Sequence, residues 1–299
     1  MSLSIAAVVL NYKTADDTIL AVRSLKASDT EMRIIVVDNA SADDSVPRLR
    51  EISGIDLIEL RQNVGFPAGC NAGIERALTA GARAVMLVNS DVIVPPDAVG
   101  TLRAILEQDA TVGIIGPVVR TRSSPDIIES AGVRYDVTTG RMRLLDHRVS
   151  PSALPPFVTR AVDAVAGCAM LVRREVFEAV GPLREDYYFG FEDIDFCLRA
   201  RQRAFGTVCC ASAFVLHEGH RSIGRQSARR AYYATRNHLL LAARHPFDST
   251  GWQRRVRLMR VLTLNLAHAA RGEEVPRLRG LYSSLAGAWD FIQGRTGAR

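Results

Sequence analysis

Short apolar runs alternate with stretches of helical periodicity over the first 120 residues, and this alternation limits the folds open to the chain. The apolar runs are continuous, as expected for strands that are buried on both faces of a sheet. Strands that alternate with helices are typical of a mainly parallel α/β sheet. The pattern predicts strands at 5–10, 34–37, 57–60, 84–88 and 112–118, and helices at 14–27, 45–52, 67–80 and 96–108.

The pattern is less regular after residue 120, where serine and proline predict loops at 123–125 and 151–156, with a hairpin near 136–140 between them. Order returns with VDAVAGCAMLVRREVFEAVG, which predicts a strand and then a short helix that ends at Gly181. The next segments predict a helix in EDIDFCLRARQRAFG and a strand in TVCCASAFVLH. From Ser227 onward the pattern is helical.

Composition excludes several classes of protein. With 47% apolar and 23% charged residues among 299, the chain is neither disordered nor fibrous. Its five cysteines include no C-x-x-C pair, which argues against a disulfide framework and a zinc site. No apolar run reaches the roughly 18 residues of a membrane-spanning helix, and the N-terminus has no signal-peptide pattern. We therefore expect a soluble, cytoplasmic protein.

Charge is distributed unevenly along the chain. The segment from His220 to Arg299 contains 15 arginines, no lysine and 4 acids, a net charge of +11, so the preceding part carries −5 of the total of +6. Such a basic segment indicates an anionic partner, namely membrane headgroups, a pyrophosphate-linked acceptor or nucleic acid. The alternative is a solvated helical surface in an arginine-rich protein. Tyr232, Tyr233 and Trp252 lie among these arginines, as aromatics do in some nucleic-acid-binding segments, but nucleic acid is not the expected partner.

Polar side chains follow four consecutive predicted strands. Any one of them could be a helix cap or a turn residue. Ligands of such sheets bind at the carboxyl ends of the strands, so polar groups at four successive ends favour a binding site there. These residues are Asn11, Asp38, Asn39, Arg61, Asn63, Asn89 and Asp91.

The sequence contains none of the motifs for dinucleotide binding, P-loops, serine hydrolases or zincins. The remaining candidates for catalysis or metal binding are a few carboxylates and one histidine. Asp91 ends a strongly apolar strand, where a carboxylate favours a cation over the alternative of capping the next helix. Glu192 and Asp193 open a helix, which the helix dipole alone would explain. The aromatic run just before them would raise a carboxyl pKa toward that of a general base.

His217 ends the last predicted strand, and a lone histidine there is more often structural than a ligand. His220, three residues on, competes with it for any role in metal binding.

Seven blocks of the sequence, in this order, resemble glycosyltransferase family 2, in particular its bacterial rhamnosyltransferase-like members. The resemblance covers about residues 4 to 245 and rests on VVLNYKT, VVDNASADDS, QNVGFPAGCNAGI, LVNSDV, GCAMLVRREVFEAVG, FEDIDFCLRAR and VLHEGH. It implies a GT-A fold, in which a nucleotide-binding half and an acceptor-binding half share one continuous mixed sheet. The implied domains are 1–225, divided at residue 120, and a basic helical extension over 226–299.

The resemblance also implies roles for the residues after the strands. Asp38 would accept a hydrogen bond from a pyrimidine ring, and Asp91 matches the last acid of the family's D-x-D element, which holds a divalent metal, Mg²⁺ or Mn²⁺. His217 matches a histidine that completes the metal site in some members. Asn89 departs from the stricter motif, because an aspartate would stand there. The remaining residues of the implied nucleotide pocket are Asn11, Arg61 and Asn63.

The implied reaction is an inverting transfer of a sugar from a nucleotide-diphosphate donor to a hydroxyl. Asp193 of the E-D pair Glu192-Asp193 matches the general base, and Tyr188 and Phe189 would border the acceptor. dTDP-rhamnose is the favoured donor and a saccharide or lipid-linked saccharide the favoured acceptor, as in bacterial surface-glycan synthesis. Two alternatives remain, a UDP-sugar transferase of the same fold and a catalytically silent nucleotide-sugar-binding protein. The basic tail would contact the inner face of an anionic membrane. The sequence does not indicate the oligomeric state.

Overall fold

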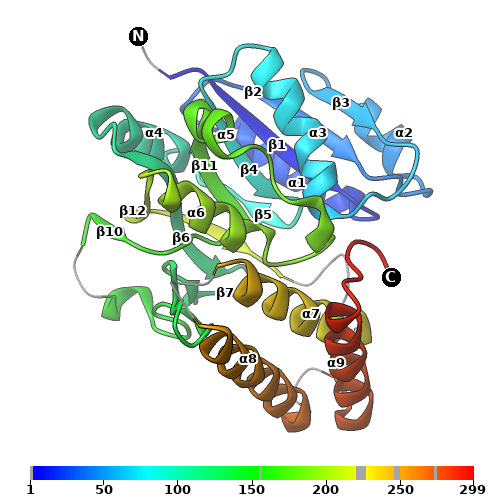
Figure 1. Ribbon diagram of the computed structural model, residues 1–299. Coiled ribbons are helices and arrows are strands. Elements are labelled where there is room, and N and C mark those ends of the chain that lie inside the picture. Colours follow the sequence, from blue (N-terminus) through cyan, green and yellow to red (C-terminus); the bar gives the residue numbers. More distant parts are fainter. Residues whose placement is uncertain (1–2, 155–156, 220–226, 246–249, 273–274) are drawn as a thin grey trace.

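The computed structural model describes residues 3–154, 157–219, 227–245, 250–272 and 275–299. Within these residues the chain forms a ten-stranded sheet, a small hairpin and a C-terminal group of helices (Figure 1). The strands predicted for the first 120 residues are confirmed as β1 (Ile5–Asn11), β2 (Met32–Asp38), β3 (Asp56–Glu59), β4 (Ala84–Asn89) and β6 (Val112–Thr121). The predicted helices are confirmed as α1 (Ala15–Lys26), α2 (Ser45–Arg50), α3 (Phe66–Thr79) and α4 (Ala98–Gln108).

The sheet is mixed. Strands β1, β2, β3 and β4 are parallel to one another, whereas β11 (Ala169–Arg173) runs antiparallel between β4 and β6. Strand β12 (Gly206–His217) is parallel to β6. The full order is β10-β12-β6-β11-β4-β1-β2-β3, with β10 at Thr159–Ala161, and β5 (Val92–Ile93) pairs with β12.

Two hydrophobic clusters form the core, one on each face of the sheet. Alternate residues of β1 divide between them, since Ala6, Val8 and Leu10 belong to one cluster and Ile5, Ala7 and Val9 to the other. Helices α3, α5 (Arg174–Val180) and α6 (Glu192–Gln202) cover the first face, and α1 and α4 cover the second. Burial on both faces explains why the strands read as continuous apolar runs.

The region after residue 120 is more ordered than its sequence pattern indicates. The predicted loop at 123–125 is wrong for its last two residues, because β7 (Ser124–Ser130) already begins at Ser124 and pairs antiparallel with β6. Its first four residues are exposed, so it has little of the apolar alternation that marks a strand. The predicted hairpin is present as β8 (Val133–Tyr135) and β9 (Met142–Leu144). Single 3-10 turns lie at Pro151–Ala153 and Glu185–Tyr187.

Three helices follow the sheet, α7 (Ala228–Arg244), α8 (Gly251–Arg271) and α9 (Arg277–Ile292). Helix α7 contacts both others and lies between them and the sheet (Figure 1). The three share a small core of Leu239, Ala242, Val261 and Ala288. Among the helices of the described residues, none has the length and apolar character needed to cross a bilayer.

Candidate active site

The register of the parallel strands brings the predicted polar residues to one edge of the sheet. Asn11 lies beside Asp38 across β1 and β2, and Leu10 lies beside Asn89 across β1 and β4. The carboxyl ends of these three strands therefore meet, which is where a sheet of this kind binds ligands.

Asn11 and Asp38 form the centre of a buried hydrogen-bond network. The Asn11 amide donates to the Asp38 carboxylate at 2.7 Å and to the Ser41 hydroxyl at 3.0 Å, and its oxygen accepts from the hydroxyls of Thr14 and Thr18. Asp38 also accepts from the backbone N–H of Ser41. Asn11 is 0% and Asp38 2% exposed, so the protein already uses much of their polar capacity. These bonds order the loop after β2, and direct contact of either residue with a nucleotide stays a prediction.

The segment that follows β3 is hydrogen-bonded to the loop before α6. Asn63 accepts hydrogen bonds from Asn39 and from the hydroxyl of Tyr188, both at 3.2 Å. The backbone N–H of Phe66 donates to the carbonyl of Tyr188 at 2.8 Å. A side chain at Gly65 would collide with the Tyr188 ring, so only glycine allows this approach. Arg61, two residues before Asn63, is exposed.

Asp91 and His217 lie together at the end of β4. The His217 Nε2 atom is 3.4 Å from an Asp91 oxygen, and its Nδ1 atom is 2.8 Å from the carboxylate of Glu129 on β7. Burial alone would lower the pKa of His217, but the hydrogen bonds and charges of the two carboxylates outweigh it and raise the pKa to about 10. Burial likewise opposes ionisation of Asp91, and the contact with His217 nevertheless lowers the pKa of this carboxyl.

The residues present fit a weakly ligated divalent cation. Asp91 and, once it releases its proton, His217 offer two ligand atoms at one point. Glu129 holds the opposite nitrogen of the imidazole as the outer partners of metal-bound histidines do. The side-chain oxygen of the neighbouring Asn89 is buried and has no hydrogen-bond partner. No group of three or more histidines, cysteines or acids suited to a metal occurs in the described part of the chain, and His220 lies outside that part. Magnesium commonly takes only one or two protein carboxylates and fills its other positions with water and phosphate.

A two-residue bridge connects this edge to Asp193. The backbone N–H of Asn89 donates to the carbonyl of Cys168 at 2.9 Å, and the N–H of the adjacent Gly167 donates to the Asp193 carboxylate at 2.7 Å. The buried Cys168 thiol has its pKa raised by desolvation and then by the charges of Glu129, Asp91 and Asp193. The three acids therefore all act electrostatically on this one residue. A side chain at Gly167 would overlap Asp193, so this glycine provides the space for the carboxylate.

Glu192 and Asp193 begin α6 in an apolar setting. The second oxygen of Asp193 accepts from the N–H of Ile194 at 2.8 Å, and burial still raises the pKa of this carboxyl above its usual value. Glu192 is 5% exposed and one of its oxygens has no partner. Burial, and secondarily the charge of Asp193, raises the pKa of Glu192 to about 8.

Helix α7 holds the loop that carries the predicted acceptor residues. The Asn237 amide lies within 2.9 Å of the carbonyl oxygens of Tyr187, Phe189 and Gly190 and donates to them. Arg236 donates to the carbonyl of Tyr187 at 2.7 Å. Tyr188 and Phe191 in this loop have positive φ, a strained conformation that persists only where surrounding contacts enforce it. The rings of Tyr188 and Phe189 contact that of Tyr233.

Three contributors to this geometry are missing from the sequence-based set, namely Glu129, Gly167 and Asn237. Glu129 lies on a strand with no recognisable pattern, and Asn237 lies inside a helix 44 residues after Asp193. Gly167 alone carried a signal, because it precedes the cysteine of the quoted block GCAMLVRREVFEAVG.

Comparison with known proteins gives one family profile and several similar proteins. The profile described as "Glycosyl transferase family 2" matches residues 4–181. Low-salt glycan biosynthesis hexosyltransferase Agl10 of Haloferax volcanii is 25% identical over 70% of this chain, which spans 66% of that protein. N-acetylglucosaminyl-diphospho-decaprenol L-rhamnosyltransferase of Mycobacterium tuberculosis is 26% identical over 76% of the chain and 79% of the relative.

A third relative is dTDP-rhamnosyl transferase RfbF of Shigella flexneri, 23% identical over 81% of this chain and 80% of the relative. Among solved structures, the mannosyltransferase PcManGT of Pyrobaculum calidifontis, in complex with GDP-Man and Mn²⁺, superposes with a TM-score of 0.60. That match has 16% identity and covers 99% of this chain and 84% of the other. The expected GT-A fold is thereby confirmed, and the chain belongs to glycosyl transferase family 2 as a glycosyltransferase.

Proposed function

We propose that this glycosyltransferase moves L-rhamnose from a dTDP-linked donor to a hydroxyl of a saccharide or lipid-linked acceptor, with inversion at the anomeric carbon, in bacterial surface-glycan synthesis at the cytoplasmic side of the membrane. The observation that carries the proposal is the bridge from Asn89 through Cys168 and Gly167 to Asp193, which brings a carboxylate to the strand end suited to a donor diphosphate. The names of the mycobacterial and Shigella relatives support rhamnose, and the latter supports dTDP.

Asp193 is the proposed general base. Its carboxylate accepts the proton of the acceptor hydroxyl while that oxygen forms a bond to the anomeric carbon. The bond from this carbon to the diphosphate oxygen breaks, and the nucleoside diphosphate leaves with the electron pair. Attack opposite the leaving group inverts the configuration. Glu192, protonated near neutral pH, adds no second negative charge beside the base.

Asp91 and His217 are the proposed protein ligands of a divalent cation, Mg²⁺ or Mn²⁺. Such a cation supplies positive charge that stabilises the diphosphate as it departs. Mn²⁺ in the mannosyltransferase neighbour supports this assignment. Asn89 replaces a charged ligand by a neutral oxygen, and Glu129 fixes the imidazole of His217 through Nδ1.

The proposed donor pocket consists of the loops after β1, β2 and β3. Asp38 receives the pyrimidine ring through its remaining acceptor positions, and Asn11, Arg61 and Asn63 line the pocket. Tyr188 and Phe189 face the acceptor. We also propose a catalytic domain over 1–225, with halves that meet at residue 120, and a basic extension over 226–299.

Two other functions differ in what they predict. A UDP-sugar transferase would have the same base and metal ligands but would select uridine. A silent binding protein would bind the donor without transfer, and the intact contacts of Asp193 with Gly167 and Ile194 favour catalysis.

The decisive experiment measures thermal stabilisation by dTDP, UDP, GDP and their sugars, with and without Mg²⁺ or Mn²⁺. We expect metal-dependent stabilisation by dTDP-rhamnose in the wild type, and its loss in Asp91→Ala. A control variant, Asp29→Ala, removes an exposed carboxylate and should behave as wild type. Preference for UDP-sugars would favour the first alternative, and a panel without any stabilising nucleotide would contradict the donor site.

A further inference from the structure

Large apolar side chains are exposed on the two last helices. Most of the large apolar residues left exposed in the described structure lie on α8 and α9 rather than around the sheet. Exposed fractions run from 43% to 84% for Trp252, Met259, Leu264, Leu278, Tyr282, Leu285, Trp289 and Ile292.

Helix α9 packs through its small residues and exposes its large ones. The exposed residues from Leu278 to Ile292 are spaced by four, three, four and three positions, so they form one stripe along the helix. The opposite face consists of Gly280, Ser283, Ser284, Gly287 and Ala288, all buried. A Cβ atom at Gly287 would lie 2.4 Å from the carbonyl oxygen of Tyr232, so this face is closed against α7. The stripe therefore lies on the side of α9 opposite its close contact with α7. Tyr282, Leu285 and Trp289 in this stripe also border a hollow that Tyr232 and Arg295 line.

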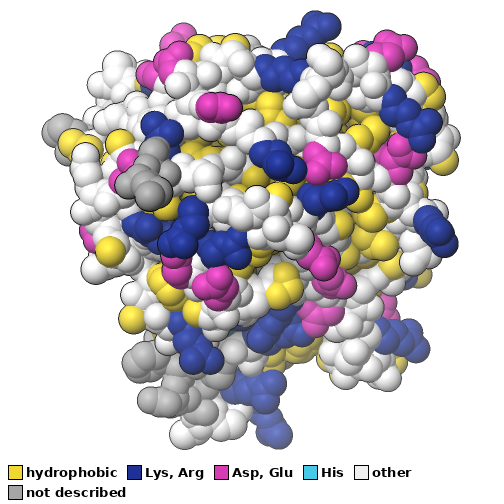
Figure 2. Space-filling view, turned by 90° about the horizontal axis from the view of Figure 1, so that it is seen from above, with side chains coloured by type: hydrophobic (Ala, Val, Ile, Leu, Met, Phe, Trp, Pro, Cys, Tyr) yellow, Lys and Arg dark blue, Asp and Glu magenta, His cyan; other side chains and the backbone are white. Residues whose placement is uncertain are grey.

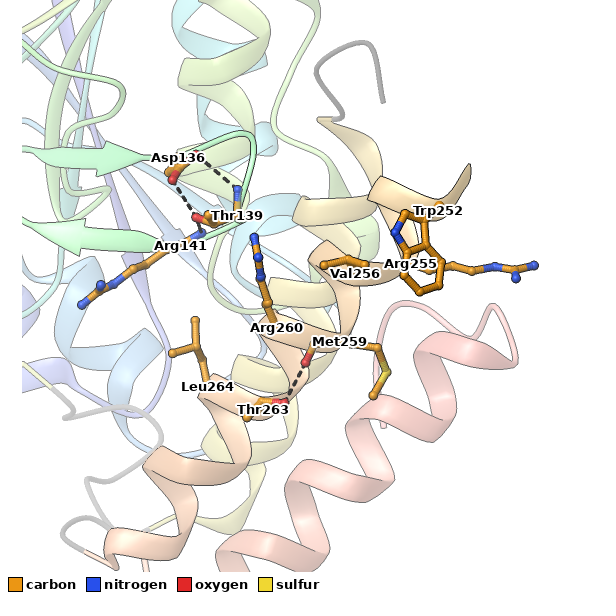
Figure 3. A pocket seen from close by; sticks show the side chains of 10 residues that line it. All are labelled: Asp136, Thr139, Arg141, Trp252, Arg255, Val256, Met259, Arg260, Thr263 and Leu264. Atoms are coloured by element: carbon orange, nitrogen blue, oxygen red, sulfur yellow. Dashed lines mark hydrogen bonds between the residues drawn. The ribbon is translucent and has the colours of Figure 1, made fainter. Parts of the chain in front are cut away.

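Helix α8 adds a second apolar surface with positive charge. A groove of about 610 Å³ lies between α8 and the hairpin of β8 and β9 (Figure 3). Its lining combines Trp252, Met259 and Leu264 with Arg255 and Arg260, and the Arg260 side chain points toward the hairpin (Figure 3). The groove also includes Arg141, and its one acid, Asp136, accepts hydrogen bonds from Thr138 and Thr139.

Cations surround the stripe as well. Arg277 and Arg279 begin α9 and Arg295 follows it, all of them exposed. Asp290 is the acid that the described part of α9 contains, and it already accepts from Tyr232 and pairs with Arg295. The far side of the molecule differs, because basic and acidic side chains are interspersed there (Figure 2).

We propose that the outer faces of α8 and α9 form a docking surface for a membrane that contains anionic phospholipid. Tryptophan and tyrosine favour the interface between headgroups and acyl chains, and arginines pair with phosphate while their stems lie on apolar surface. Each arginine near an anionic surface contributes by electrostatic attraction that salt weakens. The charge of the C-terminal segment indicated an anionic partner, and the proposal names the residues that would contact it.

A second copy of the chain is a poorer occupant of the stripe. In a helix pair, the positions beside the stripe normally carry opposite charges that select the partner. Here those positions are Arg279, Ala286 and Gln293 on one side and Leu281 on the other. At these positions of the described helix, two copies would offer arginine without an acid to meet it, whereas an anionic bilayer supplies the complementary charge.

Vesicle flotation with the full-length chain tests the proposal without any sugar donor or acceptor, so its failure would leave the proposed transfer reaction untouched. We expect flotation with phosphatidylcholine vesicles that contain phosphatidylglycerol, weaker flotation with phosphatidylcholine alone, and loss in high salt. Trp289→Ser should weaken partition about tenfold, because it removes one large apolar group that the bilayer would bury. Arg277→Gln with Arg279→Gln should weaken the preference for anionic lipid, because it removes two of the arginines of the surface.

Matched controls keep these results specific. Val158→Ser removes an apolar side chain that is 67% exposed outside α8 and α9, and Arg203→Gln removes an exposed guanidinium on the sheet domain. Both should float as wild type, and circular dichroism should show all variants folded. The proposal is overturned if no vesicle floats the protein, or if the stripe variants float unchanged. It is also overturned if light scattering shows a dimer that Trp289→Ser dissociates, since the stripe would then be an interface between copies.

Discussion

Asp193 is oriented by backbone amides on both of its oxygens. Gly167 and Ile194 donate from different segments, so the carboxylate cannot rotate without breaking one of the two bonds. Burial meanwhile keeps the pKa of this carboxyl raised, which suits a base that must accept a proton near neutral pH. Burial and nearby charges also determine the pKa values of Glu192 and of His217.

Replacement of Asp193 by asparagine should separate binding from catalysis. Asp193→Asn keeps the size of the side chain but cannot accept the acceptor's proton, so we expect transfer to fall by about 10²–10⁴-fold. Donor affinity, measured by calorimetry, should remain that of the wild type. Asp29→Asn, an exposed change, serves as the control. Full transfer activity in Asp193→Asn would rule out this residue as the base.

Glu192 should make stability depend on pH. Its folded pKa, raised to about 8, lies above the unfolded value, so the folded state retains a proton that the unfolded chain releases. Wild-type stability should therefore fall as pH rises from about 4.5 to about 8. Glu192→Gln removes this loss, and its advantage in unfolding free energy should grow by at least ~1 kcal/mol over that range. Denaturant unfolding at several pH values measures it, with the exposed Glu31→Gln as control. A difference that is constant with pH would contradict the assignment.

Glu129 should act on metal affinity through His217. Glu129→Gln keeps the size of the side chain and removes the charge that holds Nδ1, and loss of such outer partners weakens metal binding by about 10–100-fold. Electron paramagnetic resonance of Mn²⁺ in the presence of nucleoside diphosphate measures this directly. Asp126→Asn changes an exposed acid on the same strand and should have no effect. Equal Mn²⁺ affinity in both variants would show that Glu129 does not position the histidine.

Helix α7 is the element that ties the C-terminal helices to the catalytic loop. Asn237 and Arg236 donate to the carbonyls of Asp186, Tyr187, Phe189 and Gly190. His245, just after the helix, contacts Asp195 of α6 at 2.9 Å. Arg199 and Arg184 also pair with Asp195, and together with His245 they outweigh its burial and lower the pKa of this carboxyl. The start of α6, which carries the proposed base, is thus fixed by residues that follow the sheet.

Loss of the Asn237 contacts should affect turnover more than donor binding. Asn237→Ala leaves three carbonyls of the strained loop without this donor, and we expect stability to fall by about 1–3 kcal/mol. kcat should decrease while donor affinity is retained, because the donor residues lie on other loops. Gln293→Ala, on the exposed end of α9, is the matched control. Unchanged kcat in a destabilised Asn237→Ala would limit the residue to a structural role.

The whole molecule is organised by a sheet that both predicted halves share. Strand β11 from the second half lies between β4 and β6 of the first, so neither half has a sheet edge of its own at that point. Both hydrophobic clusters likewise contain residues from before and after residue 120. The two halves should therefore unfold together.

Core substitutions in either half should shift one and the same unfolding transition. Val9→Ala in β1 and Val172→Ala in β11 each remove fully buried methyl groups, at a cost of about 1–3 kcal/mol. Differential scanning calorimetry should show a single shifted peak in each case, and Val158→Ala, at an exposed site, should leave it in place. Two peaks that respond separately would show that the halves are independent.

Apolar spacing was enough to predict the elements of the first 120 residues apart from the two-residue strand β5. Strands buried on both faces need continuous apolar runs, and helices need a periodic stripe. The resemblance carried by seven ordered blocks was enough for the family. Tertiary structure alone decided the partners of the site. Glu129 meets His217 across 88 residues, and Asn237 meets Phe189 across 48. Such contacts form only when separate elements pack together, and the local pattern of neither partner records the other.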